Sequence, residues 1–204
     1  MVCLLAVILD RWLGEPRRWH PLVGFGRLAT LVERRLNQLP EKSTRSVCLG
    51  FLGALVLVLP LLMVTELLRW GLNGWLYLVL QVVVVYFVLS IRGLTEHGRA
   101  VSDALHSGDL ENARDQVGKI VSRNARELDE QGVATAATES MLENGADAVF
   151  ASLFWFLIAG LPGVLLHRMV NTLDAMWGYR NERYLYFGRV AAVATPCSSS
   201  SRAL

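Results

Sequence analysis

Residues 70–91 have the sequence WGLNGWLYLVLQVVVVYFVLSI, which is 22 residues without a charged side chain. Residues 47–65, VCLGFLGALVLVLPLLMVT, and residues 148–166, AVFASLFWFLIAGLPGVLL, are two further uncharged runs of 19 residues each. A bilayer core about 30 Å thick needs about 20 helical residues, so each run is long enough to cross it. Buried helices of a soluble bundle would show polar side chains at helical spacing, and these runs show none. The runs predict an all-α, polytopic membrane protein with spans at about 47–68, 70–91 and 148–170.

The composition supports a membrane protein. Hydrophobic residues make up 53% of the 204 residues and charged residues 19%, whereas soluble domains carry about 25% charged residues. The net charge of +2 gives no concentrated basic surface, which argues against a nucleic-acid partner. Cys3, Cys48 and Cys197 lie far apart and form no CxxC pair, which excludes a zinc ribbon and gives no sign of a disulfide framework.

Two apolar segments leave their path through the membrane open. Gly160-Leu161-Pro162-Gly163 lies inside the third run, and proline with two glycines can break a helix. This run is therefore either one kinked span or a short re-entrant hairpin. Met1 to Leu9 is apolar but too short to cross, so we expect a helix that lies at the interface or is partly inserted.

The basic residues predict the orientation. Most of those near the first spans precede residue 47, and the short link between the first two spans holds only Arg69. The positive-inside rule then places the N-terminal segment in the cytoplasm, and two crossings return residues 92–147 to the same side. The basic residues used are Arg11, Arg17, Arg18, Arg27, Arg34, Arg35, Lys42 and Arg45.

The polar segment 92–147 has a helical pattern. Leu94, Val101 and Leu105 share one helical face, and Asp109 follows Ser-Gly as the N-cap of the next helix. A second apolar stripe at a spacing of three to four residues runs from 110 to 121. A third helix is expected to begin near Asp129 or Gly132.

Three carboxylates recur every four residues on that third helix: Glu139, Glu143 and Asp147. Side chains at this spacing share one helical face. Oxygen ligands of this kind suit a hard divalent cation. A solvated acidic face, or pairing with Arg123 and Arg126, explains the same pattern.

Two other polar clusters stand out. Tyr179, Arg180, Arg183 and Tyr184 follow the third run, and they suit either the recognition of phosphate or carboxylate or a membrane-interface belt. Near the N-terminus, turn-forming Gly-x-Pro and His-Pro steps surround His20, which is either a ligand-binding or a structural residue. The sequence contains no GxxxxGK[ST], strand-linked GxGxxG or GxSxG motif.

At these clusters the chain resembles the CobD/CbiB family, the adenosylcobinamide-phosphate synthases of cobalamin biosynthesis. The matching stretches are LDRWLGEPRRWHPLVGFG, IRGLTEHGRAVSDALHSGDLENARDQVGKIVSRNARELDEQGVATAATESMLENGADAV and VNTLDAMWGYRNERYLYFG. They cover about residues 9–190 in the family's order, which indicates one membrane domain over residues 1–190.

The resemblance implies a ligase of the cell inner membrane with its polar segments in the cytoplasm. Its reaction would be ATP-dependent amide formation between adenosylcobyric acid and aminopropanol phosphate, with Mg²⁺ and ATP required. The implied partners are the corrinoid, the amino alcohol phosphate, membrane lipid and other membrane proteins of the corrinoid pathway.

With the resemblance added, we predict roles for individual residues. If Asp147 and Asp174 belong to one site, the run between them must be a hairpin. The predicted catalytic residues are Glu143, Asn144, Asp147, Asn171 and Asp174. The predicted substrate-binding residues are Asp10, His20, Arg123, Asp129, Arg180, Arg183 and Tyr184. The predicted metal ligands are Glu139, Glu143 and Asp147.

The chain departs from the family pattern in three places. Glu15 replaces the commoner aspartate before proline, and Asn124 stands where the family usually has aspartate. Residues 191–204 end in a serine run in place of further family motifs. We expect this tail to reflect a truncated or frame-shifted gene. The alternatives to the ligase are a non-catalytic sensor or assembly protein on the same scaffold, and an inactive truncated copy.

Overall fold

The computed structural model describes residues 1–14, 21–37, 44–121, 124–179, 181 and 183–194. Within these residues the chain is helical and contains no strand, which confirms the all-α prediction. The helices are α1 (Val2–Leu13), α2 (Pro21–Leu36), α3 (Thr44–Gly71), α4 (Gly74–Val88), α5 (Ile91–His106), α6 (Leu110–Val117), α7 (Glu130–Gly145), the π-helix η1 (Ala146–Ala151), α8 (Ser152–Trp177) and α9 (Arg189–Ala194).

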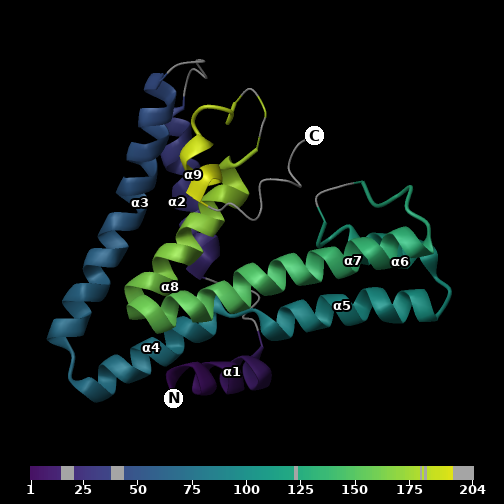
Figure 1. Cartoon of the computed structure of the whole chain (residues 1–204), viewed down its shortest axis with the longest axis horizontal. Coiled ribbons are helices and arrows are strands. Elements are labelled where there is room, and N and C mark those ends of the chain that lie inside the picture. The colour runs from purple at the N-terminus through teal and green to yellow at the C-terminus, as the bar shows by residue number, and fades with distance from the viewer. Residues whose placement is uncertain (15–20, 38–43, 122–123, 180, 182, 195–204) are drawn as a thin grey trace.

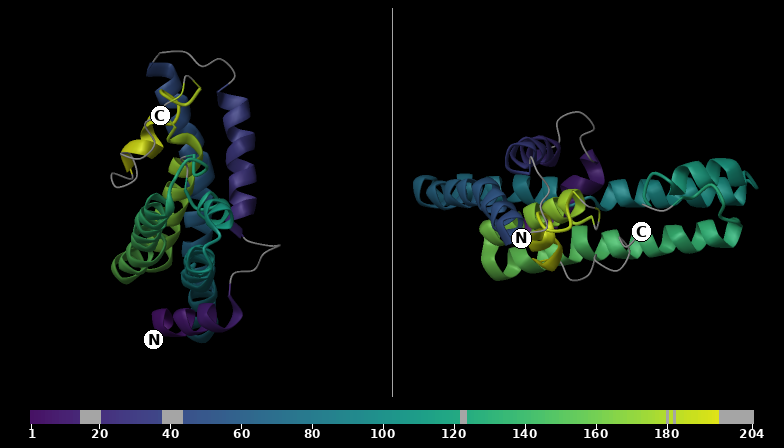
Figure 2. Two further views of the ribbon diagram at one scale, coloured as in Figure 1. Left: turned by 90° about the vertical axis from the view of Figure 1, so that its right-hand side faces the viewer. Right: turned by 90° about the horizontal axis from the view of Figure 1, so that it is seen from above.

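The helices form two arms that meet at a corner (Figure 1). The upright arm contains α2, α3, the second half of α8 and α9. The horizontal arm contains two nearly continuous rods, one made of α4 and α5, the other of α7, η1 and the first half of α8, with α6 at its far end. Helix α1 lies beneath α4 (Figure 1), and Figure 2 shows the two arms from the side and from above.

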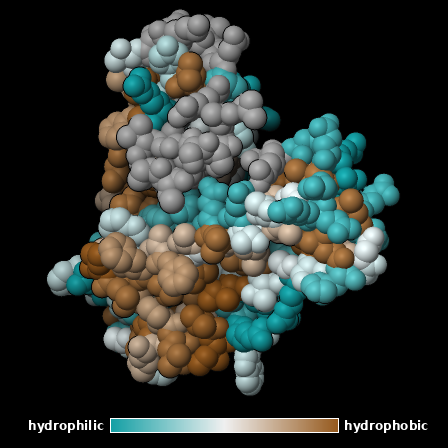
Figure 3. Space-filling view, turned by 45° about the vertical axis from the view of Figure 1, so that its right-hand side comes forward, coloured by the Kyte–Doolittle hydropathy of each residue, from teal (hydrophilic) through white to brown (hydrophobic). Residues whose placement is uncertain are grey.

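Three helical stretches are long and apolar enough to cross a membrane: Thr44–Gly71, Gly74–His106 and Glu130–Trp177. Figure 3 shows the apolar surface gathered on the lower part of the molecule and hydrophilic side chains on the arm that carries α5 to α7. Exposed apolar side chains such as Met63 and Trp75 fit contact with lipid. The length and apolar character of these helices confirm the prediction of a polytopic membrane protein.

The helix boundaries refine the first two predicted spans. Helix α3 includes the whole of predicted span 47–68. Span 70–91 is interrupted, because Asn73 caps α4 by accepting a hydrogen bond from the Leu76 amide at 2.9 Å. Helix α4 ends at Val88, and after an extended Leu89 the chain continues into α5.

The third apolar run folds back on itself. Gly160 has φ 63° and ψ −145°, which breaks α8 into two halves, and glycine adopts a positive φ at little cost. His167 Nε2 lies 3.0 Å from the Asp147 carbonyl oxygen, so residues 20 positions apart meet across the two halves. The halves also pack closely, because a Cβ on Gly163 would lie 2.5 Å from the Trp155 carbonyl oxygen. Predicted span 148–170 is therefore a helical hairpin in this structure, and not one continuous span.

The polar segment folds as predicted. Asp109 and Asp129 cap α6 and α7 by accepting hydrogen bonds from the amides of Asn112 at 3.0 Å and Gly132 at 2.7 Å. Helices α5, α6 and α7 enclose one apolar core, and Val101, Val117 and Val133 are among its buried residues. Burial of this core stabilises the packing of α5, α6 and α7 against one another at the far end of the horizontal arm.

A second core holds the upright arm together. It contains Phe25 from α2, Leu57 from α3, Trp177 from α8 and Phe187 from the segment before α9. The Trp177 and Phe187 rings meet edge to face with centroids 5.0 Å apart, a favourable aromatic geometry. This packing brings the end of α8 back against α3.

Candidate functional site

A cavity of about 320 Å³ is lined by residues of the horizontal arm together with residues of the second half of α8, which belongs to the upright arm. We call it the corner pocket. Its lining residues come from the α4–α5 junction, α5, the turn after α6, α7, η1 and α8. They are Ser90, Leu94, His97, Lys119, Ile120, Asn144, Asp147, Ala148, Arg168 and Asn171.

Three of the five predicted catalytic residues line this pocket: Asn144, Asp147 and Asn171. Asn144 lies at the end of α7 and Asp147 in η1, both before the break at Gly160. Asn171 lies in the half of α8 that follows the break. The hairpin is therefore what brings these distant polar residues together. We expected Asp147 to share a site with Asp174; the residue that lines this pocket with Asp147 from beyond the hairpin is Asn171.

Asp147 lies in a π-helix, which is a wider helical turn that is often found at functional sites. Its carbonyl oxygen faces His167 Nε2 at 3.0 Å and the Ser152 hydroxyl at 3.4 Å. These contacts satisfy a carbonyl in a region where the regular α-helical hydrogen bonds are interrupted. The His167 contact also ties the segment that carries Asp147 to the half of α8 that follows Gly160.

The pocket contains three basic side chains that our sequence analysis did not predict: His97, Lys119 and Arg168. Each comes from a different element, α5, the turn after α6 and α8. No motif groups them in the sequence, so only tertiary structure brings them together. His97 could have been singled out from the sequence, because it lies within the family-matching stretch IRGLTEHGRAV.

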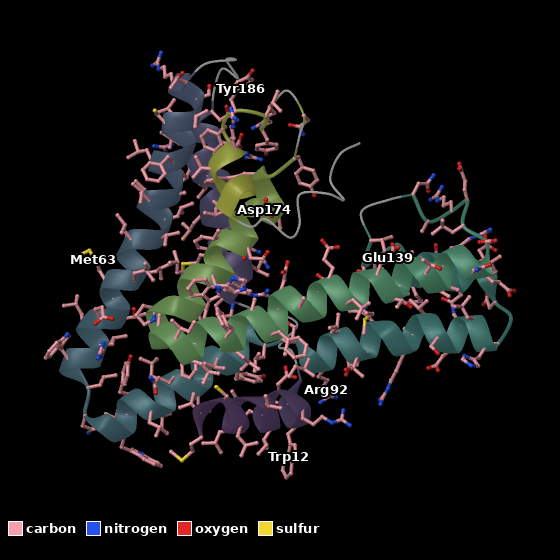
Figure 4. All side chains as sticks on the ribbon, in the orientation of Figure 1. Trp12, Met63, Arg92, Glu139, Asp174 and Tyr186 are labelled. Atoms are coloured by element: carbon pink, nitrogen blue, oxygen red, sulfur yellow. The ribbon has the colours of Figure 1, made fainter. Side chains whose placement is uncertain are left out.

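The predicted metal ligands do not form a joint site. Among the described residues, no group of three His, Cys, Asp or Glu side chains could hold a metal ion. The physical reason is the helical rise, because four residues advance about 6 Å along the axis and Glu139 therefore lies about 12 Å from Asp147. Ligands at 2.0–2.6 Å from a single ion cannot be so far apart. Glu139 and Glu143 are exposed on α7, and Glu139 projects from that helix in Figure 4.

Asp147 alone could still provide one protein ligand for a Mg²⁺ ion. Mg²⁺ commonly binds one or two carboxylates together with substrate phosphates and water. Asp147 provides a carboxylate in the corner pocket, and Asn144 and Asn171 provide amide oxygens beside it. The Mg²⁺ and ATP predictions stay predictions.

Asp174 is not among the pocket residues. It is buried near the end of α8, and its backbone carbonyl accepts the Gly178 amide hydrogen at 2.7 Å. A Cβ on Gly178 would clash with the Asp174 carboxylate. In Figure 4 Asp174 lies in the upright arm, on the second half of α8.

Two predicted substrate-binding residues cap helices. The buried Asp10 accepts a hydrogen bond from the Arg92 amide at 2.9 Å and so ties α1 to the start of α5. Arg92 in turn donates to the Trp12 carbonyl at 3.0 Å. Asp129, as described above, caps α7. The structure gives these two aspartates positions that stabilise helix N-termini.

Arg183, another predicted substrate-binding residue, is engaged by the protein. Its Nε and one terminal nitrogen donate to the two carboxylate oxygens of Glu33 at 2.9 and 3.0 Å. Asn37 donates to Glu33 at 3.1 Å and to the Arg183 carbonyl at 2.8 Å. The hydrogen bond and the charge of Glu33 raise the pKa of Arg183 above its ordinary value. The neighbouring Tyr184 ring centroid lies 5.8 Å from the guanidinium carbon.

This arrangement neutralises a buried carboxylate, which would be costly if unpaired. Neither Arg183 nor Tyr184 is among the described residues that line the corner pocket. The remaining predicted substrate-binding residues, His20, Arg123 and Arg180, lie outside the described residues.

The profile of the CobD/Cbib protein family matches residues 3–195. The chain belongs to the CobD/Cbib family. The family resemblance seen in the sequence is thereby confirmed. No solved structure matches the chain significantly.

Curated relatives of this CobD/Cbib chain carry the name cobalamin biosynthesis protein CobD. Those of Chromobacterium violaceum and Stutzerimonas stutzeri are each 52% identical to the chain; both matches cover 92% of it, and 61% and 60% of the relatives. The relative from Halalkalibacterium halodurans is 38% identical over 92% of the chain and 59% of its own length. The chain thus spans about three fifths of the length of these relatives.

Most pocket residues of this CobD/Cbib chain fall within stretches that first indicated the family. The middle stretch supplies His97, Lys119, Asn144 and Asp147, and the last supplies Asn171. Arg168 lies just before the last stretch. Two of the three family stretches, the middle one and the last, therefore meet in space at the corner pocket.

Proposed function

We propose that the chain acts in cobalamin biosynthesis as an ATP-dependent ligase that joins adenosylcobyric acid to an amino alcohol phosphate. The observation that carries this proposal is the corner pocket, in which polar residues of two separate family stretches face one cavity. The names of the relatives support the pathway, and the resemblance supports the reaction.

The reaction has a simple balance. A carboxylate oxygen of the corrinoid attacks the γ-phosphorus of ATP, which gives an acyl phosphate and releases ADP. The amine nitrogen then attacks the acyl carbon, phosphate leaves, and the amide forms. One proton is released overall when the amine begins as an ammonium ion and the carboxyl as a carboxylate. The protein must therefore hold an amine and a phosphate-rich group together and compensate their charges.

The lining residues match these requirements. Lys119 and Arg168 supply positive charge for phosphoryl groups. Asp147 supplies a carboxylate that can hold an ammonium or share a Mg²⁺ ion with substrate phosphates. When bound, Mg²⁺ would neutralise charge on the transferring phosphoryl group.

The proposed location is the inner membrane, with the pocket on the cytoplasmic side, where ATP is available. The positive-inside argument supports this side for both the N-terminal segment and residues 92–147. Both ends of the hairpin, at Asp147 and Asn171, line the pocket. All parts of the proposed site therefore lie on one face.

The test is complementation of a strain that lacks the synthase and is supplied with cobyric acid. We expect the 204-residue chain to restore cobalamin-dependent growth and the formation of cobinamide phosphate. We expect Asp147→Asn to abolish both. Asp103→Asn, which changes the same type of residue on the exposed surface of α5, should retain both.

Two outcomes would contradict the proposal. No cobinamide phosphate despite intact protein in the membrane would show that this chain alone does not perform the ligation. Equal growth with the wild-type chain and with Asp147→Asn would show that the reaction does not need Asp147 of the corner pocket. The second outcome would favour a non-catalytic role on the same scaffold.

A further inference from the structure

A second cavity, of about 390 Å³, shares no lining residue with the corner pocket. It lies where the end of α3 and one face of α4 meet the turn of the helical hairpin, and we call it the hairpin-tip pocket. In Figure 1 the turn between α3 and α4 lies at the lower left, on the same side as the turn of α8. The lining residues are Arg69, Tyr77, Gln81, Ile158, Ala159, Gly160, Leu161 and Pro162. The proposed ligase reaction uses none of them.

The surroundings of this pocket are those of a membrane boundary. Trp70 and Trp75 flank the turn between α3 and α4 and are 85% and 71% exposed, and tryptophan is enriched where a membrane meets water. At the hairpin turn Leu157 and Ile158 are exposed as well, and Ile158 also lines the pocket. The pocket is therefore continuous with a surface that faces lipid, so a lipid molecule can enter it sideways.

Two polar side chains in the pocket have no partner within the described part of the chain. Tyr77 and Gln81 are four residues apart and so share one face of α4. Neither the Tyr77 hydroxyl nor the Gln81 amide forms a hydrogen bond with a described residue. Gln81 is half-buried and interrupts an otherwise apolar stretch of this span, where an unsatisfied amide is costly. A polar ligand in the pocket would satisfy both groups.

Arg69 brings a positive charge to the same pocket. One of its terminal nitrogens lies 3.6 Å from the Glu66 carboxylate, and both side chains of this pair are exposed. Exposed pairs of this kind contribute little stability. The guanidinium has further N–H donors in a planar fork, so Arg69 can contact Glu66 and an anion in the pocket together.

The chemistry of the lining suits one class of group. A guanidinium, a phenol hydroxyl and an amide NH₂ can all donate hydrogen bonds, and only the guanidinium is charged. A phosphodiester carries one negative charge and several acceptor oxygens, and arginine binds phosphate in two-pronged fashion. The rest of the lining is apolar, with Leu161 and Pro162 beside Ile158. Such walls suit a ligand in which the phosphate is joined to hydrocarbon.

We propose that the hairpin-tip pocket binds the phosphodiester group of a membrane glycerophospholipid. Arg69, Tyr77 and Gln81 donate hydrogen bonds to its phosphate oxygens, and the apolar walls contact its glycerol and the start of its acyl chains. On the orientation proposed above, this lipid belongs to the non-cytoplasmic leaflet, on the side opposite the corner pocket. It fills the space between α3, α4 and the hairpin turn and so supports the turn in the membrane.

The test measures which lipid the protein retains. The full chain is purified in maltoside detergent, mixed with phosphatidylglycerol and analysed by native mass spectrometry. Diacylglycerol with the same acyl chains is the comparison ligand, because it lacks the phosphodiester. We expect phosphatidylglycerol to bind at least about tenfold more tightly than diacylglycerol, since only the former engages the three polar side chains. Equal binding of the two lipids would overturn the proposal.

Two variants test the polar contacts. Arg69→Gln removes the charge, and Gln81→Leu replaces the amide by an apolar side chain that suits a membrane helix. Each should weaken phosphatidylglycerol binding by about tenfold and leave diacylglycerol binding unchanged. Unchanged phosphatidylglycerol binding by both variants would contradict the assignment.

Matched controls make the same changes elsewhere. Arg11→Gln removes an exposed arginine from α1, and Gln131→Leu replaces an exposed glutamine of α7. Both should bind phosphatidylglycerol as the wild-type chain does. Circular dichroism and elution volume establish that each variant is folded. A loss of binding in Arg11→Gln as large as in Arg69→Gln would show that charge anywhere on the protein attracts the lipid, and would overturn the proposal.

Two other occupants give different results in the same experiment. A site for free phosphate would lose phosphatidylglycerol when millimolar inorganic phosphate is added, whereas we expect no competition. A contact between two copies of this chain would give a lipid-free dimer that Gln81→Leu dissociates, whereas we expect lipid bound to the wild-type chain without such a dimer. Either of these alternative results would overturn the proposal.

Discussion

At the scale of single residues, the contact between His167 and the Asp147 carbonyl is the most informative. A carbonyl oxygen can only accept, so His167 must present a protonated Nε2 at this 3.0 Å contact. The contact links the π-helix to the returning half of the hairpin. His167 thus acts as a positioning residue for the segment that carries Asp147.

We predict that His167→Leu lowers the rate of cobinamide phosphate formation by about five- to tenfold, since an unsatisfied carbonyl costs about 1–3 kcal/mol and the segment would relax. His167→Gln places an amide donor near the same point and should stay within about twofold of wild type. The rate at which membranes that contain each variant form cobinamide phosphate measures both.

The control for this prediction is His106→Leu. His106 Nδ1 also lies close to a backbone carbonyl, that of Ser102 at 2.8 Å, but at the far end of α5. Its loss should leave the rate of cobinamide phosphate formation unchanged. Equal rates for His167→Leu and His167→Gln would show that the hydrogen bond does not position Asp147.

At the scale of elements, the upright arm depends on close backbone contact. Gly50 in α3 faces the Phe187 carbonyl so closely that a Cβ on Gly50 would clash with it. The same segment places Phe187 against Trp177 in the core. A glycine at this point of α3 therefore determines how near the chain after α8 can approach.

We predict that Gly50→Ala destabilises the folded chain by about 1–3 kcal/mol, because overpacking forces the backbone apart. Thermal unfolding in detergent, followed by tryptophan fluorescence, measures the effect. Gly71→Ala is the matched control, because it lies in the same helix with nothing within 4 Å of the added methyl group. A loss of stability as large for Gly71→Ala as for Gly50→Ala would contradict the packing explanation.

At the scale of the whole molecule, the helical hairpin determines which segments share a side of the membrane. Glu143 precedes it and Tyr179 follows it, and both are exposed. A single span between them would put these residues on opposite sides. A hairpin puts both on the side where the corner pocket opens.

We predict that Glu143→Cys and Tyr179→Cys are labelled from the same side by a membrane-impermeant maleimide, in a background with the three native cysteines replaced by serine. Labelling of intact cells and of inverted vesicles measures the side. Gly71→Cys, in the exposed end of α3, should be labelled from the opposite side and provides the reference. Labelling of residues 143 and 179 from opposite sides would exclude the hairpin topology.

The sequence by itself determined the helical class, the membrane-spanning helices, the caps of α6 and α7, and the family. These features are local, because hydrophobic length, capping side chains and short motifs act over neighbouring residues. Sequence analysis also singled out Asn144, Asp147 and Asn171, which line the corner pocket. Its predicted metal ligands share a helical phase, but among the described residues no group of three His, Cys, Asp or Glu side chains could hold a metal ion.

Only the tertiary structure decided which polar residues meet. The break at Gly160 could be foreseen as a possibility, but whether the run crosses or returns depends on what the second half packs against. His97, Lys119 and Arg168 belong to three elements, and no local pattern links them. Arg183 was predicted to bind substrate, yet it pairs with Glu33, 150 residues away along the chain. Such long-range partners follow from packing of the whole chain, because the free energy that selects them comes from burial shared by many residues.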